Sequence, residues 1–197
     1  MANWCSTSYV IESDNQELLQ QICNVINECA EMKEPLISKS SVNWAGNTFK
    51  KLGIDPDKAD RTFWSDARME SGNLHFFEES AWGRGDAIEV LHEHYVNEEG
   101  DCPLSVYFIS EELGCGIFQT NDEDGEYFAD KYIFVSTDDT CYYESFEELE
   151  KDVQDYLEVD TDFESVEDMQ EALDEANKKD DSKIGSVYEV EYVDLMY

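Results

Sequence analysis

Six cysteines are the residues of this chain best suited to metal or redox chemistry, and their spacing argues against both. They are Cys5, Cys23, Cys29, Cys102, Cys115 and Cys141. Zinc and iron–sulfur sites need several thiolates at short spacings, and the sequence contains no CxxC pair. Cys23 and Cys29 are six residues apart in an apolar helical pattern. This pattern predicts buried, reduced thiols with no metal between them.

The histidines give little indication of a catalytic or metal site. His92 and His94 are two residues apart, and side chains at that spacing point to different sides of a helix. We therefore expect a solvated helix end there. Cysteine–histidine catalysis needs a thiol of low pKa beside an imidazole, and the chain lacks a nucleophile elbow, a glycine-rich oxyanion turn and a phosphate loop. We expect no catalytic residue, cofactor or resident metal.

The acidic segment NDEDG resembles a calcium-binding loop only in part. Aligning Gly125 with the obligatory glycine of an EF-hand places Asp122 and Asp124 at two ligand positions. The first ligand position is then Thr120, and the last, which should be glutamate, is Lys131. The segment therefore predicts a hairpin turn that binds divalent cations weakly at most.

Charge is the most unusual property of the sequence. It holds 13 basic and 48 acidic residues, a net charge of −35. The first 71 residues carry a net −4 (7 basic, 11 acidic), and the remainder carry −31 (6 basic, 37 acidic). Such a charge repels nucleic acid and anionic membranes, so it excludes a nucleic-acid-binding role. A partner should be basic, although adaptation to high salt is another explanation of the acidity.

The densest acidic segment, residues 137–181, contains 19 acids and 3 lysines. Its apolar spacing predicts two amphipathic helices, about 145–157 and 165–176, with their carboxylates directed outward. With those of 121–130, these carboxylates are expected to form one continuous negative face. The candidate partner-binding residues are Asp122, Asp124, Glu147, Glu148, Asp152, Asp155, Glu164, Glu167, Asp168 and Glu171.

A charge density comparable with that of DNA requires a one-sided distribution. A globule of this size exposes about 9,500 Å², or about one net charge per 270 Å² if the charge is evenly spread. A DNA duplex carries about one charge per 107 Å². Concentrated on half of the surface, the charge of this chain approaches the density of DNA, so the sequence permits DNA mimicry.

Hydrophobic periodicity predicts an α+β fold. The expected elements, in chain order, are a strand at 4–12, a helix at 14–31, strands at 62–70 and 74–81, a helix at 85–95 and a strand at 104–110. Ser13 or Asp14 is expected to cap the first helix, with Glu17 completing a capping-box-like pair with Asp14. This β-α-β-β-α-β order is that of the ferredoxin-like antiparallel sheet.

We expect a ferredoxin-like domain at 1–136 and an acidic extension at 137–197. The first contains an insert at 33–61, with a short helix near 44–52, and a further strand at 127–135. The second contains the two acidic helices and a last alternating strand, SVYEVEYVDL, packed on the same domain.

Three segments resemble a known family. The start MANWC and the stretches SAWGRGDAIEVL and SEELGCGIFQTNDEDGEYFADKY are similar to uncharacterised proteins of phages and conjugative elements that are described by a ferredoxin-like domain. The similarity covers about residues 1–12 and 74–145. It implies a mobile-element origin and a ferredoxin-like fold, and it implies no activity or catalytic residue.

The opening segment, MANWCSTSYVIESD, lacks the basic and apolar regions of a signal peptide, and no stretch has the ~18–20 apolar residues of a membrane span. We therefore expect a cytoplasmic protein with free thiols. The expected function is non-catalytic: binding of a basic, nucleic-acid-handling protein, as a DNA mimic or an anti-defence inhibitor. The alternatives are an acidic accessory or structural protein without inhibitory activity and, less favoured, an unrecognised enzyme or metal binder.

Overall fold

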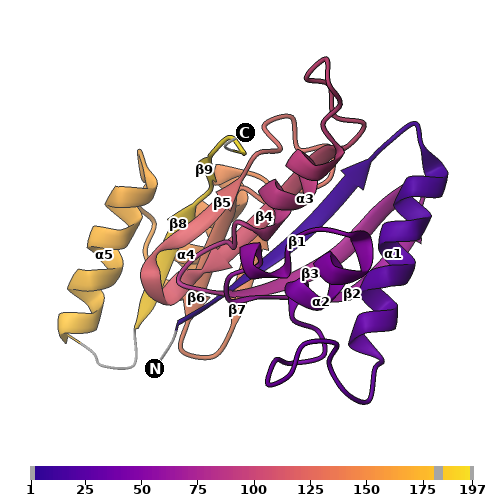
Figure 1. Cartoon of the computed structure of the whole chain (residues 1–197). Helices are drawn as coiled ribbons and strands as arrows, with labels where there is room; N and C mark the ends of the chain where they lie inside the picture. The colour runs from indigo at the N-terminus through magenta and orange to yellow at the C-terminus, as the bar shows by residue number, and fades with distance from the viewer. Residues whose placement is uncertain (1–2, 180–183, 196–197) are drawn as a thin grey trace. The chain divides into compact units, whose positions relative to one another are not determined.

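The structure, a computed structural model, describes residues 3–179 and 184–195 and has an α+β architecture (Figure 1). The chain forms two compact units, Met1–Glu123 with Tyr192–Tyr197, and Asp124–Glu191. The second unit is thus inserted into the chain of the first. Within the described residues, no helix is both long and apolar enough to cross a membrane.

The first unit is built on a sheet with the strand order β2-β3-β1-β4-β5-β9. Its strands are β1 (Trp4–Glu12), β2 (Thr62–Glu70), β3 (Asn73–Ala81), β4 (Ser105–Glu112), β5 (Ile117–Thr120) and β9 (Glu191–Tyr192). β1 pairs antiparallel with β3 and β4, and β2 and β5 add antiparallel outside them. The strands predicted at 4–12, 62–70, 74–81 and 104–110 thus belong to one antiparallel sheet, as expected.

Three helices pack on one face of this sheet: α1 (Gln16–Ala30), α2 (Ala45–Leu52) and α3 (Ala87–Tyr95). Figure 1 shows α1 and α3 on the same side. The register places Tyr9 opposite both Phe76 and Phe108, so the three rings face the same layer. Tyr9 and Phe76 stack with ring centroids 4.9 Å apart. Both predicted helices therefore cover the same face of the sheet.

Local sequence explains the turns of the first unit. Ser71 and Gly72 both have positive φ, 54° and 91°, as a two-residue hairpin between β2 and β3 requires. Gly53, with φ 82°, ends α2 in the left-handed region. The insert packs into the core as well, since Phe49 of α2 contacts Trp64 edge to face, with ring centroids 5.5 Å apart.

The cap of α1 differs from the prediction. Asn15 occupies the N-cap position, and its side-chain oxygen accepts from the backbone N–H of Leu18 at 3.1 Å. The Ser13 hydroxyl instead accepts from the Asn15 N–H at 3.0 Å. Because the helix begins after Asn15, the expected pair of Asp14 and Glu17 is out of register with it.

The second unit has its own sheet and core. Its strands are β6 (Tyr132–Ser136), β7 (Thr140–Tyr143) and β8 (Gly185–Glu189), in the order β7-β6-β8, and its helices are α4 (Phe146–Leu157) and α5 (Val166–Lys179). Phe134 of β6 pairs with Val187 of β8, and both pack against Leu149 of α4 and Leu173 of α5.

The boundary between the units lies at 124 and not at 137 as expected. The strand predicted at 127–135 begins at Tyr132 and pairs with β7 and β8, which makes it part of the second unit. The last predicted strand divides into β8, which lies in the second unit, and β9, within which the chain returns to the first unit at Tyr192. The sequence missed β7, because its four residues bury no side chain fully.

Candidate functional site

The exposed carboxylates of the second unit gather on α4, α5 and the segment between them. Each helix buries one apolar face, through Leu149 and Val153 on α4 and through Met169 and Leu173 on α5. Acids recur on the remaining positions. We call the following exposed set the acidic surface: Glu147, Glu148, Asp152, Asp155, Glu158, Asp160, Asp162, Glu164, Glu167, Asp168, Glu171, Asp174 and Glu175.

Nine of the ten residues predicted to bind a partner are exposed, eight on the acidic surface and Asp124 at the start of the second unit. Asp122 corrects the prediction. It is 3% exposed and belongs to the first unit. The period-two burial of Phe118 and Thr120 on β5 extends to Asp122, and its backbone N–H donates to Thr120 Oγ1 at 3.1 Å. The carboxylates of residues 180 and 181 lie outside the described residues.

Cations are scarce around the acidic surface. The described residues between 124 and 191 include 22 acids and 4 lysines. Even if every lysine paired with one carboxylate, 18 acids would remain. In the first unit, by contrast, ion pairs join Lys51 to Glu28, Arg68 to Glu70 and Arg84 to Glu89. The second unit is therefore a concentrated source of negative potential.

Hydrogen bonds fix parts of the acidic surface in place. The Tyr143 hydroxyl donates to Asp152 at 2.6 Å. Burial and this neighbouring carboxylate raise the pKa of Tyr143, so the phenol remains a donor. Glu150 of α4 accepts from the backbone N–H of Phe163 at 2.7 Å, which ties the connecting segment back to the helix. The carboxylates are thus displayed on an ordered scaffold.

A second polar cluster, which sequence reasoning missed, lies in the core of the first unit. Glu78 of β3 is fully buried. Its carboxylate accepts from the indole N–H of Trp64 and from the backbone N–H of Gly85, both at 2.9 Å. Burial raises the pKa of Glu78 to about 7, although these hydrogen bonds act in the opposite direction. The carboxyl therefore exchanges its proton near neutral pH.

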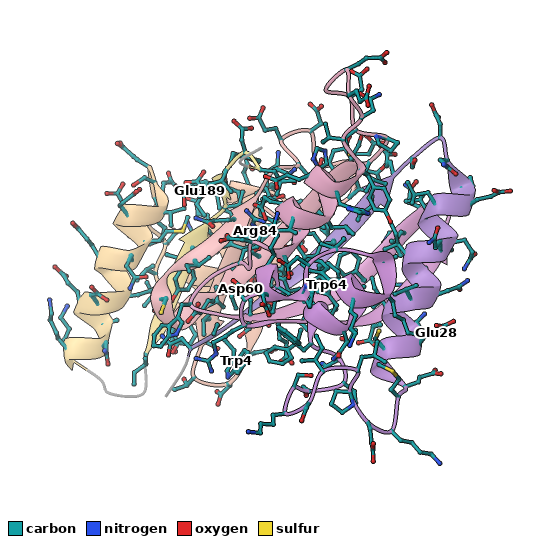
Figure 2. All side chains as sticks on the ribbon, viewed as in Figure 1. Trp4, Glu28, Asp60, Trp64, Arg84 and Glu189 are labelled. Atoms are coloured by element: carbon teal, nitrogen blue, oxygen red, sulfur yellow. The ribbon has the colours of Figure 1, made fainter. Side chains whose placement is uncertain are left out.

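Arg84, which is labelled together with Trp64 in Figure 2, carries the positive charge of this cluster. Burial lowers its pKa, but the hydrogen bond to Glu89 at 2.5 Å, the charge of Glu89 and the interactions with Tyr9 together outweigh burial and raise it. The guanidinium carbon lies 4.7 Å from the centre of the Phe108 ring, within the range of a cation–π contact. Burial raises the pKa of the nearby Cys5 thiol to about 11, so Cys5 is protonated and a poor nucleophile.

The sequence did contain a signal for this cluster. Leu74, Phe76 and Glu78 alternate on one face of β3, so the period that buries the two apolar residues also buries the acid. Gly85 then lies against the sheet. A Cβ atom at Gly85 would meet Thr62 Oγ1 at 2.0 Å, so glycine is required for the loop to reach Glu78. The hydrogen-bond partners of Glu78 are thus a neighbouring side chain and a backbone amide of the same unit. Their hydrogen bonds attach the Gly85 loop to the sheet.

Burial of Cys23 and Cys29 is confirmed, and all six thiols are free. Burial lowers the pKa of the partly buried His92, whereas His94 is exposed and its ring contacts Tyr95 edge to face. In the described part of the chain, no group of three or more His, Cys, Asp or Glu residues is placed to hold a metal ion.

Comparison of the chain with protein-family models, with curated proteins and with solved structures finds no match.

Proposed function

We propose that the chain is an interaction protein whose acidic surface binds a basic surface on another protein. The observation that carries the proposal is the excess of 22 acids over 4 lysines among the described residues of the second unit. Exposed ion pairs contribute little to stability, whereas unbalanced like charges oppose folding. A cationic partner offsets this repulsion, and long-range attraction accelerates its association.

The linear density of carboxylates favours a partner that handles nucleic acid. α4 has 12 residues and α5 has 14, and each carries five acids. At 1.5 Å per residue the helices are about 18 and 21 Å long, so each presents one carboxylate per ~4 Å. One strand of duplex DNA presents a phosphate per ~3.4 Å. We infer that the acidic surface competes with nucleic acid for the same basic surface of the partner, and that this takes place in the cytoplasm.

We also infer a ferredoxin-like topology for the first unit. Support comes from the strand order β2-β3-β1-β4 with antiparallel pairing throughout, and from α1 and α3 packing on one face. A mobile-element origin, which the resemblance of residues 1–12 and 74–145 implies, fits a protein that blocks or redirects a host protein bound to DNA.

The test replaces four carboxylates of the acidic surface, Asp155, Asp160, Glu164 and Glu171, by lysine. These positions avoid the first turns of both helices and the Tyr143–Asp152 hydrogen bond. A partner captured from lysate at low salt is purified, and its affinity is measured by calorimetry at about 0.1 and about 0.5 M salt. We expect the variant to bind at least tenfold more weakly at low salt, because attraction becomes repulsion at four positions.

A matched control makes the same change in charge on the first unit, by replacing the exposed Glu34, Glu93, Glu98 and Glu99 with lysine. It should bind within about twofold of the natural chain. Duplex DNA should displace the natural chain from the partner. Binding that is insensitive to salt, or equally weakened in both variants, would show that the acidity serves solubility alone.

A further inference from the structure

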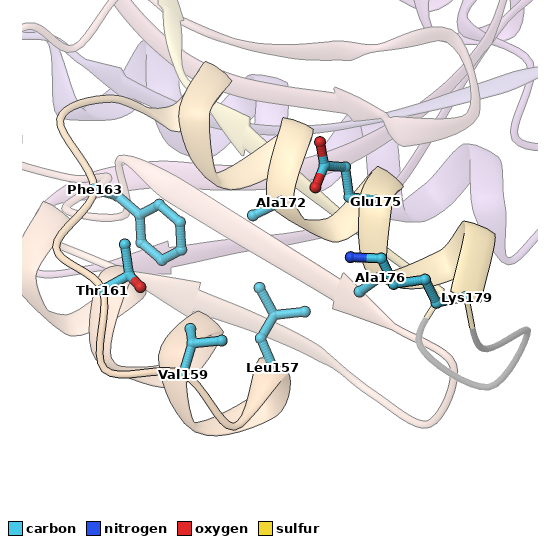
Figure 3. Close-up of a pocket in the computed structure, with 8 residues that line it drawn as sticks. All are labelled: Leu157, Val159, Thr161, Phe163, Ala172, Glu175, Ala176 and Lys179. Atoms are coloured by element: carbon cyan, nitrogen blue, oxygen red, sulfur yellow. The ribbon is translucent and has the colours of Figure 1, made fainter.

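An apolar groove lies within the acidic surface, between α5 and the segment that follows α4 (Figure 3). Its volume is about 400 Å³, in the range of small-ligand pockets. The lining residues are Leu157, Val159, Thr161, Phe163, Ala172, Glu175, Ala176 and Lys179. Five of the eight are apolar, and Val159 is 40% exposed.

Hydrogen bonds of the connecting segment fix one wall of the groove. Gln154 of α4 donates from its side chain to the carbonyl of Thr161 at 2.9 Å. Glu150 accepts from the N–H of Phe163 at 2.7 Å. These bonds fix Thr161 and Phe163 relative to α4, and Phe163 also packs against the core of the unit. An occupant would therefore enter a preformed site and lose little free energy to ordering it.

The charges around the groove select its occupant. Asp160 and Asp162 flank Thr161 in the sequence and are exposed. Glu175 lines the groove on α5, with Lys179 one turn further along. Acids therefore outnumber the single lining lysine. A second copy of this chain would bring another acidic surface against the first, and nucleic acid would be repelled for the same reason.

We propose that the groove receives the apolar side chains of a cationic amphipathic helix in the partner. The lysines and arginines of that helix would pair with the carboxylates around the groove. This is the helix-in-groove mode of recognition. The inference rests on the proposed function and makes it more specific, because it requires apolar contact in addition to charge.

Two synthetic peptides of about 14 residues test it. Both carry lysines at the same positions; one has leucines at helical spacing and the other has glutamines in their place. Affinity for the full chain is measured by calorimetry at about 0.1 and about 0.5 M salt. We expect the lysine–leucine peptide to bind at least tenfold more tightly at both salt concentrations.

Two substitutions in the groove, Val159→Ser and Ala176→Gln, should each remove most of that difference. Neither Val159 nor Ala176 is a core residue of the unit, so both variants are expected to fold. The matched control is Val96→Ser, since Val96 is 38% exposed and lies in the first unit. It should leave both affinities unchanged.

The possible outcomes distinguish apolar binding in the groove from purely electrostatic binding to the acidic surface. Equal, salt-sensitive binding of both peptides would overturn the groove proposal and leave the acidic surface as the binding element. A leucine preference that survives both groove substitutions would also overturn it, because the apolar contact would then lie elsewhere. Absent or salt-insensitive binding of both peptides would contradict the proposed function itself.

Discussion

Glu78 is a residue whose protonation near neutral pH the fold changes. It sits on an apolar strand face, where its carboxylate accepts from the Trp64 indole and the Gly85 amide, and the nearby charge of Arg84 also favours its ionised form. Its charge acts in turn on two buried neighbours, since it contributes to the raised pKa values of Cys5 and Tyr9. Burial favours the neutral carboxyl, so the folded chain holds a proton that the unfolded chain releases.

The stability of the protein should therefore fall as pH rises through the range in which Glu78 loses this proton. Its folded pKa is about 7 against an ordinary 4.5, so its stabilising contribution is complete below about pH 4.5 and lost above about pH 7. At ~1.4 kcal/mol per pKa unit, the contribution is about 3 kcal/mol. Urea unfolding of Glu78→Gln should show a correspondingly shallower dependence on pH.

Glu79→Gln is the control, because Glu79 is adjacent and exposed and the substitution removes the same charge. A second readout is the indole N–H resonance of Trp64, which should shift near pH 7 in the natural chain. Parallel stability curves for the natural chain and Glu78→Gln, together with a Trp64 signal that does not titrate, would show that Glu78 ionises normally.

At the scale of elements, α1 and α4 each combine one apolar face with an N-cap side chain that accepts from a backbone N–H of the first turn. α1 shows how a shift of one residue changes which side chain provides the cap. Asn15 accepts from the Leu18 N–H, and Ser13 supports Asn15 in turn. α4 begins in the same way, with Ser145 accepting from the Glu148 N–H at 3.4 Å.

Replacing the observed cap of α1 should cost more than replacing the neighbouring acid. Asn15→Ala removes the acceptor for the Leu18 N–H and should lower the free energy of unfolding by about 1 kcal/mol. Asp14→Ala should cost a few tenths of a kcal/mol through the helix dipole. Urea denaturation of both variants measures the difference, and an equal or larger loss for Asp14→Ala would place the cap at Asp14.

For the whole molecule, repulsion among carboxylates is the dominant electrostatic property. The net charge is −35, and salt screens charges separated by more than about 10 Å at 0.1 M ionic strength. Each unit has its own apolar core, so folding proceeds against this repulsion through burial of apolar surface.

Stability should consequently rise with salt. We expect the urea midpoint to increase steadily from about 0.05 to about 0.5 M sodium chloride, because screening weakens repulsion more in the folded state than in the expanded one. The fourfold variant at Asp155, Asp160, Glu164 and Glu171, which lowers the net negative charge by eight, should show a smaller increase. A midpoint that is unaffected by salt in both proteins would mean that the repulsion is negligible.

Much of this arrangement could be predicted from the sequence because it depends on local pattern. Alternation of apolar residues located β1 at 4–12 without error, and spacings of three and four residues located α1, α4 and α5 within a few residues at each end. The acidity of the second unit is a property of composition. Most exposed carboxylates follow from it, since charged side chains remain in water unless a partner compensates for burial.

Tertiary structure alone decided which segments share a core. Tyr132–Ser136 reads as a continuation of the first sheet, yet its partners are β7 and a strand about fifty residues later. The burial of Asp122 and Glu78 also depends on neighbours that are distant in the sequence. The same holds for the groove, because Val159 and Ala176 line it from different segments. Local pattern specifies which face of an element is apolar, but the segment that covers this face is selected by packing and pairing across the whole chain.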